Sequence, residues 1–91
     1  MDRFLIEVPH EEEVVACARV VQTFLETGSH YLTNADWGCH DGDHRAWLIV
    51  EASDKEEATM IVPPPYRHQA HVVQLSKFTM EEVEEILASH A

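Results

Sequence analysis

The sequence predicts an α+β domain of the ferredoxin-like class, with a four-stranded antiparallel sheet and an added C-terminal helix. Three observations lead to this prediction: a period-two alternation near the N-terminus, a long segment with helical apolar spacing, and two strand-like segments separated by an Asp-Gly step. The expected order of elements is β-α-β-β-α-β. No segment resembles a linker between two cores, so residues 1–91 are expected to form a single domain.

The first strand is expected over residues 3–8, where apolar side chains occupy every second position. A proline ends this strand, and three successive glutamates follow it, which favour a helix N-terminus because of the helix macrodipole. The helix is expected over residues 11–27, with Gly28 as a left-handed C-cap. Cys17 lies on the apolar stripe of this helix, so a buried and inert thiol is expected there.

The second and third strands are expected over residues 30–37 and 45–52. The first of these segments is rich in strand formers, and the second contains four consecutive apolar residues, which is typical of a strand buried on both faces. Residues 38–43 between them carry the Asp-Gly step, which is the turn chemistry of a hairpin. The two strands are therefore expected to pair antiparallel.

A short second crossover helix is expected to begin at the capping box of residues 53–56 and to end at the three prolines of residues 63–65. The fourth strand is expected over residues 71–78, and an amphipathic helix opens at Thr79. Right-handed crossovers would place both crossover helices on one face of the sheet, with the first and third strands central and parallel. The other face would be bare, and a homodimer would cover it.

The composition excludes several classes of partner. Seventeen acidic residues against six basic residues give a net charge of −11, which repels nucleic acid and anionic lipid, so neither nucleic acid nor a membrane is an expected partner. Charged residues interrupt the N-terminal segment too early for a signal peptide, which favours a cytoplasmic location. Two cysteines are too few for a disulfide framework, and both are expected to remain thiols.

The seven histidines are the unusual feature of the composition. With the first and third strands parallel, four histidines and Glu51 would lie near one edge of the sheet. Imidazole and carboxylate groups suit Ni, Zn or Cu, so the sequence predicts a metal site there. The predicted ligands are His10, His30, His68 and His71. The alternative is that these four histidines are solvated residues of turns and loops.

The predicted hairpin, at the opposite edge, holds three further metal-ligand types: Cys39, His40 and His44. This group lacks the paired Cys-x-x-Cys spacing typical of zinc sites, so a purely structural hairpin is the competing interpretation. Glu7 is an acid on a central strand, where it would face a wet cavity or pair with Arg45. A role for Glu7 as a general base is a third alternative.

Three passages resemble a family of small ferredoxin-like proteins, once called domains of unknown function, that includes nickel-binding members. These passages are Val8-Pro9-His10, the segment 51–58, and His68-Gln69-Ala70-His71. The resemblance implies the fold, a dimer, and metal binding at His10, His68 and His71. The chain departs from that family because a single histidine, rather than a pair, follows the first strand.

The leading hypothesis is a homodimer that binds a divalent transition metal through histidines. One alternative is a small-molecule enzyme of the dimeric α+β barrel type, similar to monooxygenases or isomerases, with a cavity by the sheet. Another is a non-catalytic assembly module. The motifs of the common nucleotide-binding proteins, hydrolases and metalloproteases do not occur, so no organic cofactor is expected.

Overall fold

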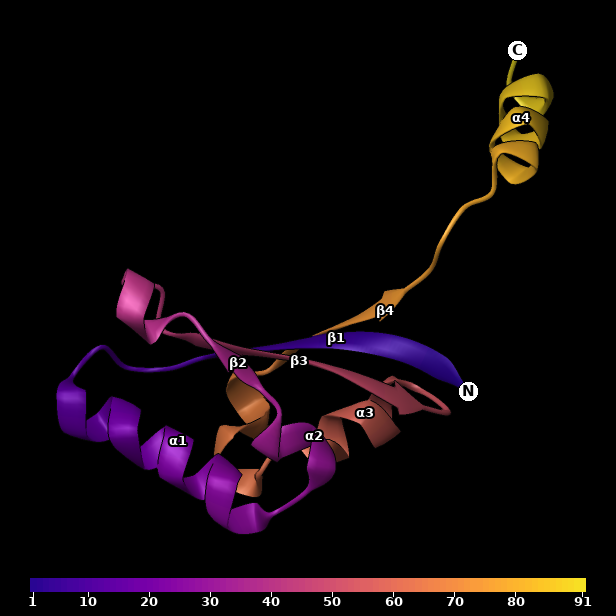
Figure 1. Ribbon diagram of the computed structural model, residues 1–91. Coiled ribbons are helices and arrows are strands. Elements are labelled where there is room, and N and C mark those ends of the chain that lie inside the picture. The colour runs from indigo at the N-terminus through magenta and orange to yellow at the C-terminus, as the bar shows by residue number, and fades with distance from the viewer.

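The computed structural model describes all 91 residues and has the predicted α+β architecture with a four-stranded antiparallel sheet (Figure 1). The strands are β1 (Asp2–Pro9), β2 (Asp36–Trp37), β3 (Arg45–Ala52) and β4 (His71–Leu75). Their order across the sheet is β2-β3-β1-β4, so β1 and β3 are central.

The central strands β1 and β3 run antiparallel, and the prediction that they are parallel was wrong. The first crossover returns the chain so that β2 runs in the direction of β1. The hairpin then reverses the chain, because β2 and β3 pair antiparallel. In the resulting register Asp2 lies opposite Ala52 and Pro9 lies opposite Arg45. The end of β1 therefore meets the start of β3, and this pairing decides where the candidate site forms.

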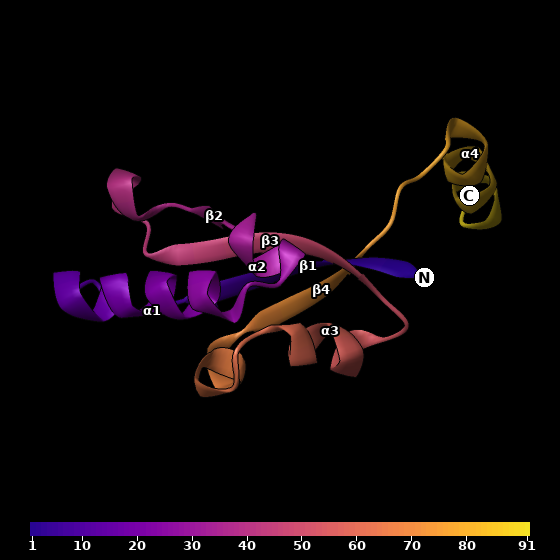
Figure 2. The same ribbon diagram turned by 60° about the horizontal axis from the view of Figure 1, so that its bottom comes forward.

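Helical segments cover one face of the sheet, as the two views in Figures 1 and 2 show. They are α1 (Val14–Thr27), α2 (His30–Thr33), α3 (Lys55–Ile61) and the 3-10 helix η2 (Pro64–Gln69). The carboxylate of Glu13 caps α1 by accepting hydrogen bonds from two backbone amides of its first turn. Gly28 ends α1 with a φ of 73°, which is the left-handed C-cap that the sequence predicts.

Residues 30–33 form the short helix α2 and not the start of a strand, so the predicted second strand was too long. Ser29 accepts hydrogen bonds at its carbonyl from the backbone and the side chain of Thr33, which closes one helical turn. That turn buries Leu32 completely, and packing of α2 against β3 has overridden the strand propensity of the segment. The fourth strand also ends earlier than predicted, at Leu75.

The hydrophobic core lies between the sheet and the helices. Alternate residues of β1 and β3 point into it, and α1 contributes Val20 and Phe24. Its thirteen buried apolar side chains are Phe4, Ile6, Val8, Val20, Phe24, Leu32, Ala46, Leu48, Val50, Ala52, Ala58, Val62 and Val72.

The last helix, α4 (Met80–Ser89), lies apart from this body at the end of an extended strap, residues 76–79 (Figure 1). The radius of gyration is 16.4 Å, and the longest dimension of the molecule is 54 Å. A compact chain of this length would have a radius of gyration of about 12 Å. The difference reflects the projecting α4.

Candidate metal centre

Two histidines meet where β1 ends and β3 begins. Because Pro9 pairs with Arg45, the residues just beyond this pair, His10 and His44, are also neighbours. The backbone amide of His10 donates a hydrogen bond of 2.9 Å to the carbonyl of His44. Their rings lie edge to face, with centroids 5.8 Å apart. Ordinary β-sheet pairing therefore fixes the relative position of the two imidazoles.

The hairpin between β2 and β3 brings Cys39 close to His10 and His44, and the region where these residues meet is called the corner below. Cys39 begins the 3-10 helix η1 (Cys39–Asp41), which the left-handed Gly42 ends at a φ of 81°. The carbonyl of Gly38 accepts hydrogen bonds from the amides of Asp41 and Asp43, and these bonds fold the loop tightly. A Cβ at position 38 would lie 2.6 Å from a backbone oxygen, so only glycine allows this path.

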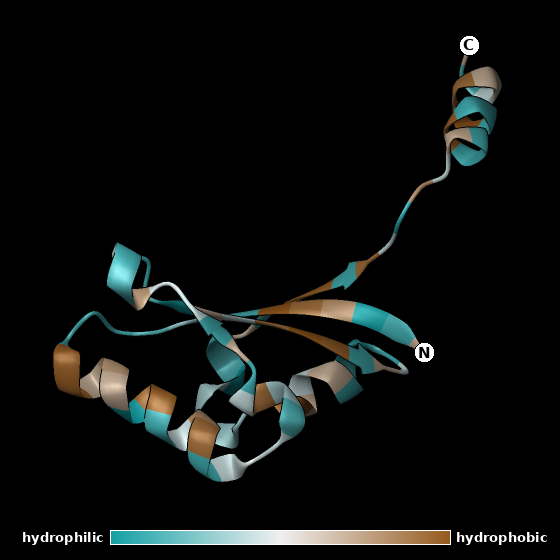
Figure 3. Ribbon diagram, in the orientation of Figure 1, coloured by the Kyte–Doolittle hydropathy of each residue, from teal (hydrophilic) through white to brown (hydrophobic).

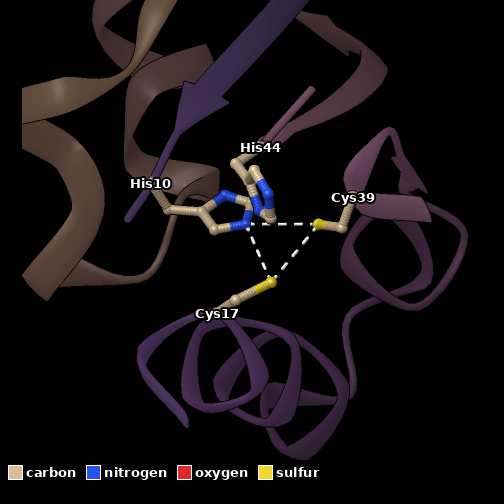
Figure 4. Close-up of side chains that lie close together, drawn as sticks. All are labelled: His10, Cys17, Cys39 and His44. Carbon is tan, nitrogen blue, oxygen red and sulfur yellow. Dashed lines mark hydrogen bonds between the residues drawn. The ribbon is translucent and has the colours of Figure 1, made fainter. Parts of the chain in front are cut away.

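Cys17 approaches the corner from the N-terminal part of α1. Its amide donates to the carbonyl of Glu13, so its position follows directly from the helix cap. Val20 and Phe24, further along the same helix, are buried in the core and hold α1 against the body. The Cys17 side chain is partly buried and points toward Cys39 and His10 (Figure 4).

The four potential ligand atoms of His10, Cys17, Cys39 and His44 lie within 4.8 Å of one another. The Nε2 atom of His10 is 3.3 Å from each of the two sulfurs, and the sulfurs are 3.4 Å apart (Figure 4). In a tetrahedral zinc site, bond lengths of about 2.0–2.3 Å put nitrogen about 3.5 Å from sulfur and two sulfurs about 3.8 Å apart. The observed distances approach these values to within a few tenths of an ångström. This group could hold a metal ion.

The hydrogen bonding of the imidazoles also fits metal binding. The Nδ1 atom of His10 is 3.4 Å from the carbonyl oxygen of Val8, an acceptor for a proton on that nitrogen. The opposite nitrogen, Nε2, then carries a lone pair that faces the sulfurs, as in metal-ligating histidines. The buried Nδ1 of His44 has no hydrogen-bond partner, and an unsatisfied polar atom at this depth is costly. Coordination in this corner would relieve that cost.

The surroundings of Cys39 disfavour its thiolate form. Burial raises the pKa of the Cys39 thiol above its ordinary value, and the adjacent Cys17 acts in the same direction. Two thiolates 3.4 Å apart would repel each other strongly without a cation between them. A metal ion would supply that positive charge and displace the thiol protons.

A groove of about 690 Å³ opens beside the corner. Cys17, Cys39 and His44 line it together with apolar residues of α1 and with Trp37. The groove gives solvent a route to the ligand atoms, so a metal ion could enter without unfolding of the core.

Of the predicted ligands, only His10 belongs to this group. His30 begins α2 and contacts Asn34, and the exposed His68 lies in η2. His71 begins β4, with its Nδ1 3.6 Å from a carboxylate oxygen of Glu7. The structure therefore does not bring these three histidines together with His10.

Strand direction explains only part of this difference, because His71 keeps its predicted place near the end of β1, opposite Glu7, but lies on the sheet face away from the helices. The parallel arrangement would have placed the end of β3, with Glu51, beside the end of β1, but Glu51 pairs instead with Arg3 at the opposite end of the sheet. The same reversal brings the hairpin to His10, whereas the sequence analysis placed the hairpin at the opposite edge. Of the three hairpin candidates, Cys39 and His44 join the site, whereas the exposed His40 only lines the groove.

Cys17 is the candidate ligand that the sequence analysis discounted. Its helical spacing from Phe24 correctly indicated the inner face of α1, although Val20 is buried there and Val14, assigned to the same stripe, is largely exposed. That face, however, meets the apolar core only along its later turns, and at the first turns it meets the hairpin. The signal that could have identified the site is the pairing of one cysteine and one histidine on each side of the first crossover: His10 with Cys17, and Cys39 with His44.

Glu7 has no part in this corner. One carboxylate oxygen accepts a hydrogen bond of 3.1 Å from the indole nitrogen of Trp47. This bond holds the pKa of Glu7 below its ordinary value, and His71 contributes in the same direction. A lowered pKa disfavours the predicted alternative of a general base, since such a base works best near the ambient pH.

No protein-family model, curated protein or solved structure matches this chain. None of its helices combines the length and the apolar character needed to cross a bilayer.

Proposed function

We propose that the protein binds one zinc ion in a Cys₂His₂ site formed by His10, Cys17, Cys39 and His44. The observation that carries the proposal is the convergence of two sulfurs and two imidazoles from distant parts of the chain within 4.8 Å. Two thiol ligands with two imidazole ligands make one of the common sets for structural zinc. Thiolate ligands also persist best where thiols stay reduced, which favours a cytoplasmic protein.

Zinc is favoured over nickel and copper by the geometry of the donors. The three separations among His10 Nε2 and the two sulfurs, 3.3–3.4 Å, are near the edges of a tetrahedral site, and a His44 nitrogen lies within 4.8 Å of each of these atoms. Nickel(II) and copper(II) prefer square-planar or tetragonal arrangements of nitrogen and oxygen donors. The mixed sulfur and nitrogen set therefore suits zinc best among the three metals predicted from the sequence.

The role that we propose for the ion is structural. It would join the end of β1, the first turns of α1, the hairpin and the start of β3, four segments that meet beside an open groove. Small domains commonly need such a metal or a disulfide because their cores are small. The order of the strands along the chain and across the sheet further supports assignment of the zinc-stabilised domain to the ferredoxin-like class.

A catalytic zinc is the less favoured alternative. Catalytic sites keep a coordination position for water, with three protein ligands. The corner offers four protein donors, which fill a tetrahedral zinc and leave no position for a substrate. The enzyme hypothesis therefore receives less support from this site than a structural or metal-binding role does.

The proposal can be tested by titrating the reduced, metal-free chain with Co²⁺ and then displacing the cobalt with zinc. Cobalt in a tetrahedral site with two thiolates should give visible ligand-field bands and sulfur-to-metal charge-transfer bands at one equivalent. Cys17→Ser and His44→Ala should each weaken binding by at least about tenfold, since outer-shell changes alone cost that much.

His40→Ala is the matched control for His44→Ala, because both histidines belong to the same hairpin and only His44 lies in the cluster. It should leave the affinity unchanged. A triple His30→Ala, His68→Ala, His71→Ala variant tests the ligand set predicted from the sequence. Binding that survives Cys17→Ser but is lost in the triple variant would refute the Cys₂His₂ assignment.

A further inference from the structure

One face of the sheet has no helix over it. The side chains on this open face belong to the odd-numbered residues of β1 and β3, because alternate residues point to opposite faces. Leu5 lies at its centre, with Ile49 opposite on β3 and Val73 opposite on β4. The Ile49 side chain is 56% exposed and Val73 is 37% exposed. An apolar row therefore crosses three strands and meets solvent.

Charged residues flank this row without a strong excess of either sign. Arg3 lies between Glu51 and Leu75 in the next row of the sheet, and Glu7 lies between Trp47 and His71 on the other side. In a chain with a net charge of −11, such a balanced surface is unusual. An acidic partner would meet far less repulsion here than elsewhere on the molecule.

The second uncovered surface is α4. Its apolar side chains share one side of the helix, at positions three and four residues apart, and most are largely exposed: Met80, Val83, Ile86 and Leu87. Four glutamates occupy the remaining positions of its first turns. Every hydrogen bond made by its backbone or side chains stays within residues 79–90. Figure 3 shows its apolar bands standing clear of the body.

A helix of ten residues is only marginally stable alone in water, so α4 requires a surface to pack against. The strap of residues 76–79 spans about 13 Å when extended and leads α4 away from its own sheet. In Figure 1, α4 lies on the side of the sheet opposite to α1, α2 and α3, which is the side of the open face, but beyond the strands. In this position α4 lies away from its own sheet and is surrounded by solvent.

We propose that α4 packs its apolar stripe on the open sheet face of a second copy of the chain, and that two copies exchange α4 reciprocally. Each chain carries both complementary surfaces, an apolar helix stripe and an apolar strand row, and covers neither by itself. A twofold exchange fills both sites in both copies. The glutamates of α4 would lie near Arg3 and His71, at the rim of the receiving face. The exchange does not depend on the zinc site.

Sedimentation of the full chain at micromolar concentration tests the exchange. The wild-type chain should be a dimer. Leu87→Asp should raise the dimer dissociation constant at least about thirtyfold, as for an interface hot spot. Ala88→Asp adds the same carboxylate on the opposite side of α4 and should leave the dimer intact. Because α4 does not contact the core, both variants should keep a cooperative unfolding transition of the body. Leu87→Asp alone should lose the helical far-ultraviolet signal of α4 together with the dimer.

The occupant of the open face can be identified in a mixture of isotope-labelled and unlabelled chains. Filtered nuclear Overhauser contacts between the methyl groups of Leu87 and those of Ile49 or Val73 should occur between chains. The same contacts within one monomeric chain would show that α4 folds onto its own sheet and would overturn the proposal. A monomer without such contacts, or a dimer insensitive to Leu87→Asp, would also overturn it.

Discussion

Two regions of the fold are stabilised in different ways. One is the hydrophobic core, an apolar layer between the sheet and the helices, and the other is the His/Cys corner. The layer contains thirteen buried apolar side chains from strands and helices. The corner contains four half-buried residues that could bind a metal, while Val14 and Val15 at the adjacent helix start stay largely exposed. Hydrophobic burial can stabilise the layer without any ligand. Because the apolar side chains beside the corner stay unburied, the stability of the corner has to come from another source.

This difference indicates how the small domain divides its stabilising interactions. Apolar residues of α1 reach the core only through its later turns, where Val20 and Phe24 are buried. The first turns lie where the sheet ends and the hairpin begins, and there the chain supplies sulfur and nitrogen donors instead. If the zinc proposal is correct, metal coordination stabilises this corner in the way that buried apolar side chains stabilise the core.

The largest effect should come from zinc itself. With free zinc at a thousand times its dissociation constant, the unfolding free energy should exceed that of the metal-free protein by about 4 kcal/mol. Hydrogen exchange should show that zinc removal exposes the amides of residues 10–17 and 38–44 while the amides of β1 and β3 stay protected. Denaturant titration with and without zinc measures the first quantity.

Ile6→Val serves as the control from the apolar layer. Ile6 is fully buried, so its truncation should cost about 0.5–1.5 kcal/mol, both with and without zinc. The stabilisation by zinc should then stay the same as in the wild-type chain. If zinc removal instead exposed the amides of β1 and β3 as readily as those of the corner, the two regions would not be separable.

Much of the fold could be predicted because periodicity and turn residues are local signals. The strand alternation around Phe4, the left-handed Gly28 and the Asp-Gly hairpin all have their predicted roles. The length of the second strand could not be predicted in this way. The burial of Leu32 depends on packing between α2 and β3, which is a contact between segments distant in the sequence.

The candidate site depended on one non-local fact, the relative direction of the central strands. An antiparallel pairing of β1 with β3 puts His44 beside His10, whereas a parallel pairing would have put Glu51 there. The hydrophobic pattern of each strand is the same in both cases. The predicted order of elements is not, because a crossover from β1 to β2 followed by a β2-β3 hairpin makes β3 antiparallel to β1, so the parallel prediction was inconsistent with the predicted topology. Cys17 was discounted for a separate reason, since helical spacing identifies the inner face but not what that face meets.

Gly38 sets the path of the hairpin, so Gly38→Ala should perturb both the overall stability and the geometry of the corner. The added Cβ would lie 2.6 Å from the carbonyl oxygen of Asp43 and 2.8 Å from the Trp47 ring. The backbone must shift to relieve this, at a cost of about 1–3 kcal/mol in unfolding free energy. Because the shift also moves Cys39, zinc affinity should fall, and both quantities can be measured by denaturant and metal titration.

Gly28→Ala is the matched comparison, because Gly28 has a positive φ but lies at the far end of α1. It should cost about 1 kcal/mol through backbone strain alone. Its zinc affinity should equal that of the wild-type chain. Equal losses of zinc affinity in the two glycine variants would mean that overall stability, and not the path of the hairpin, controls the site.

The smallest effect should come from Glu7, which lies on the open face of the sheet, outside both the apolar layer and the corner. The hydrogen bond from Trp47 keeps the pKa of Glu7 below its ordinary value of 4.5, so this carboxylate stabilises the fold above that pH. The contribution is lost as the pH falls below 4.5 through the lowered pKa. With the Glu7 side chain 27% exposed, it amounts to less than about 1 kcal/mol. In metal-free protein, Glu7→Gln should flatten the acid limb of stability, measured by denaturant titration at each pH. An unchanged acid limb in Glu7→Gln would mean that other groups cause the acid sensitivity of the fold.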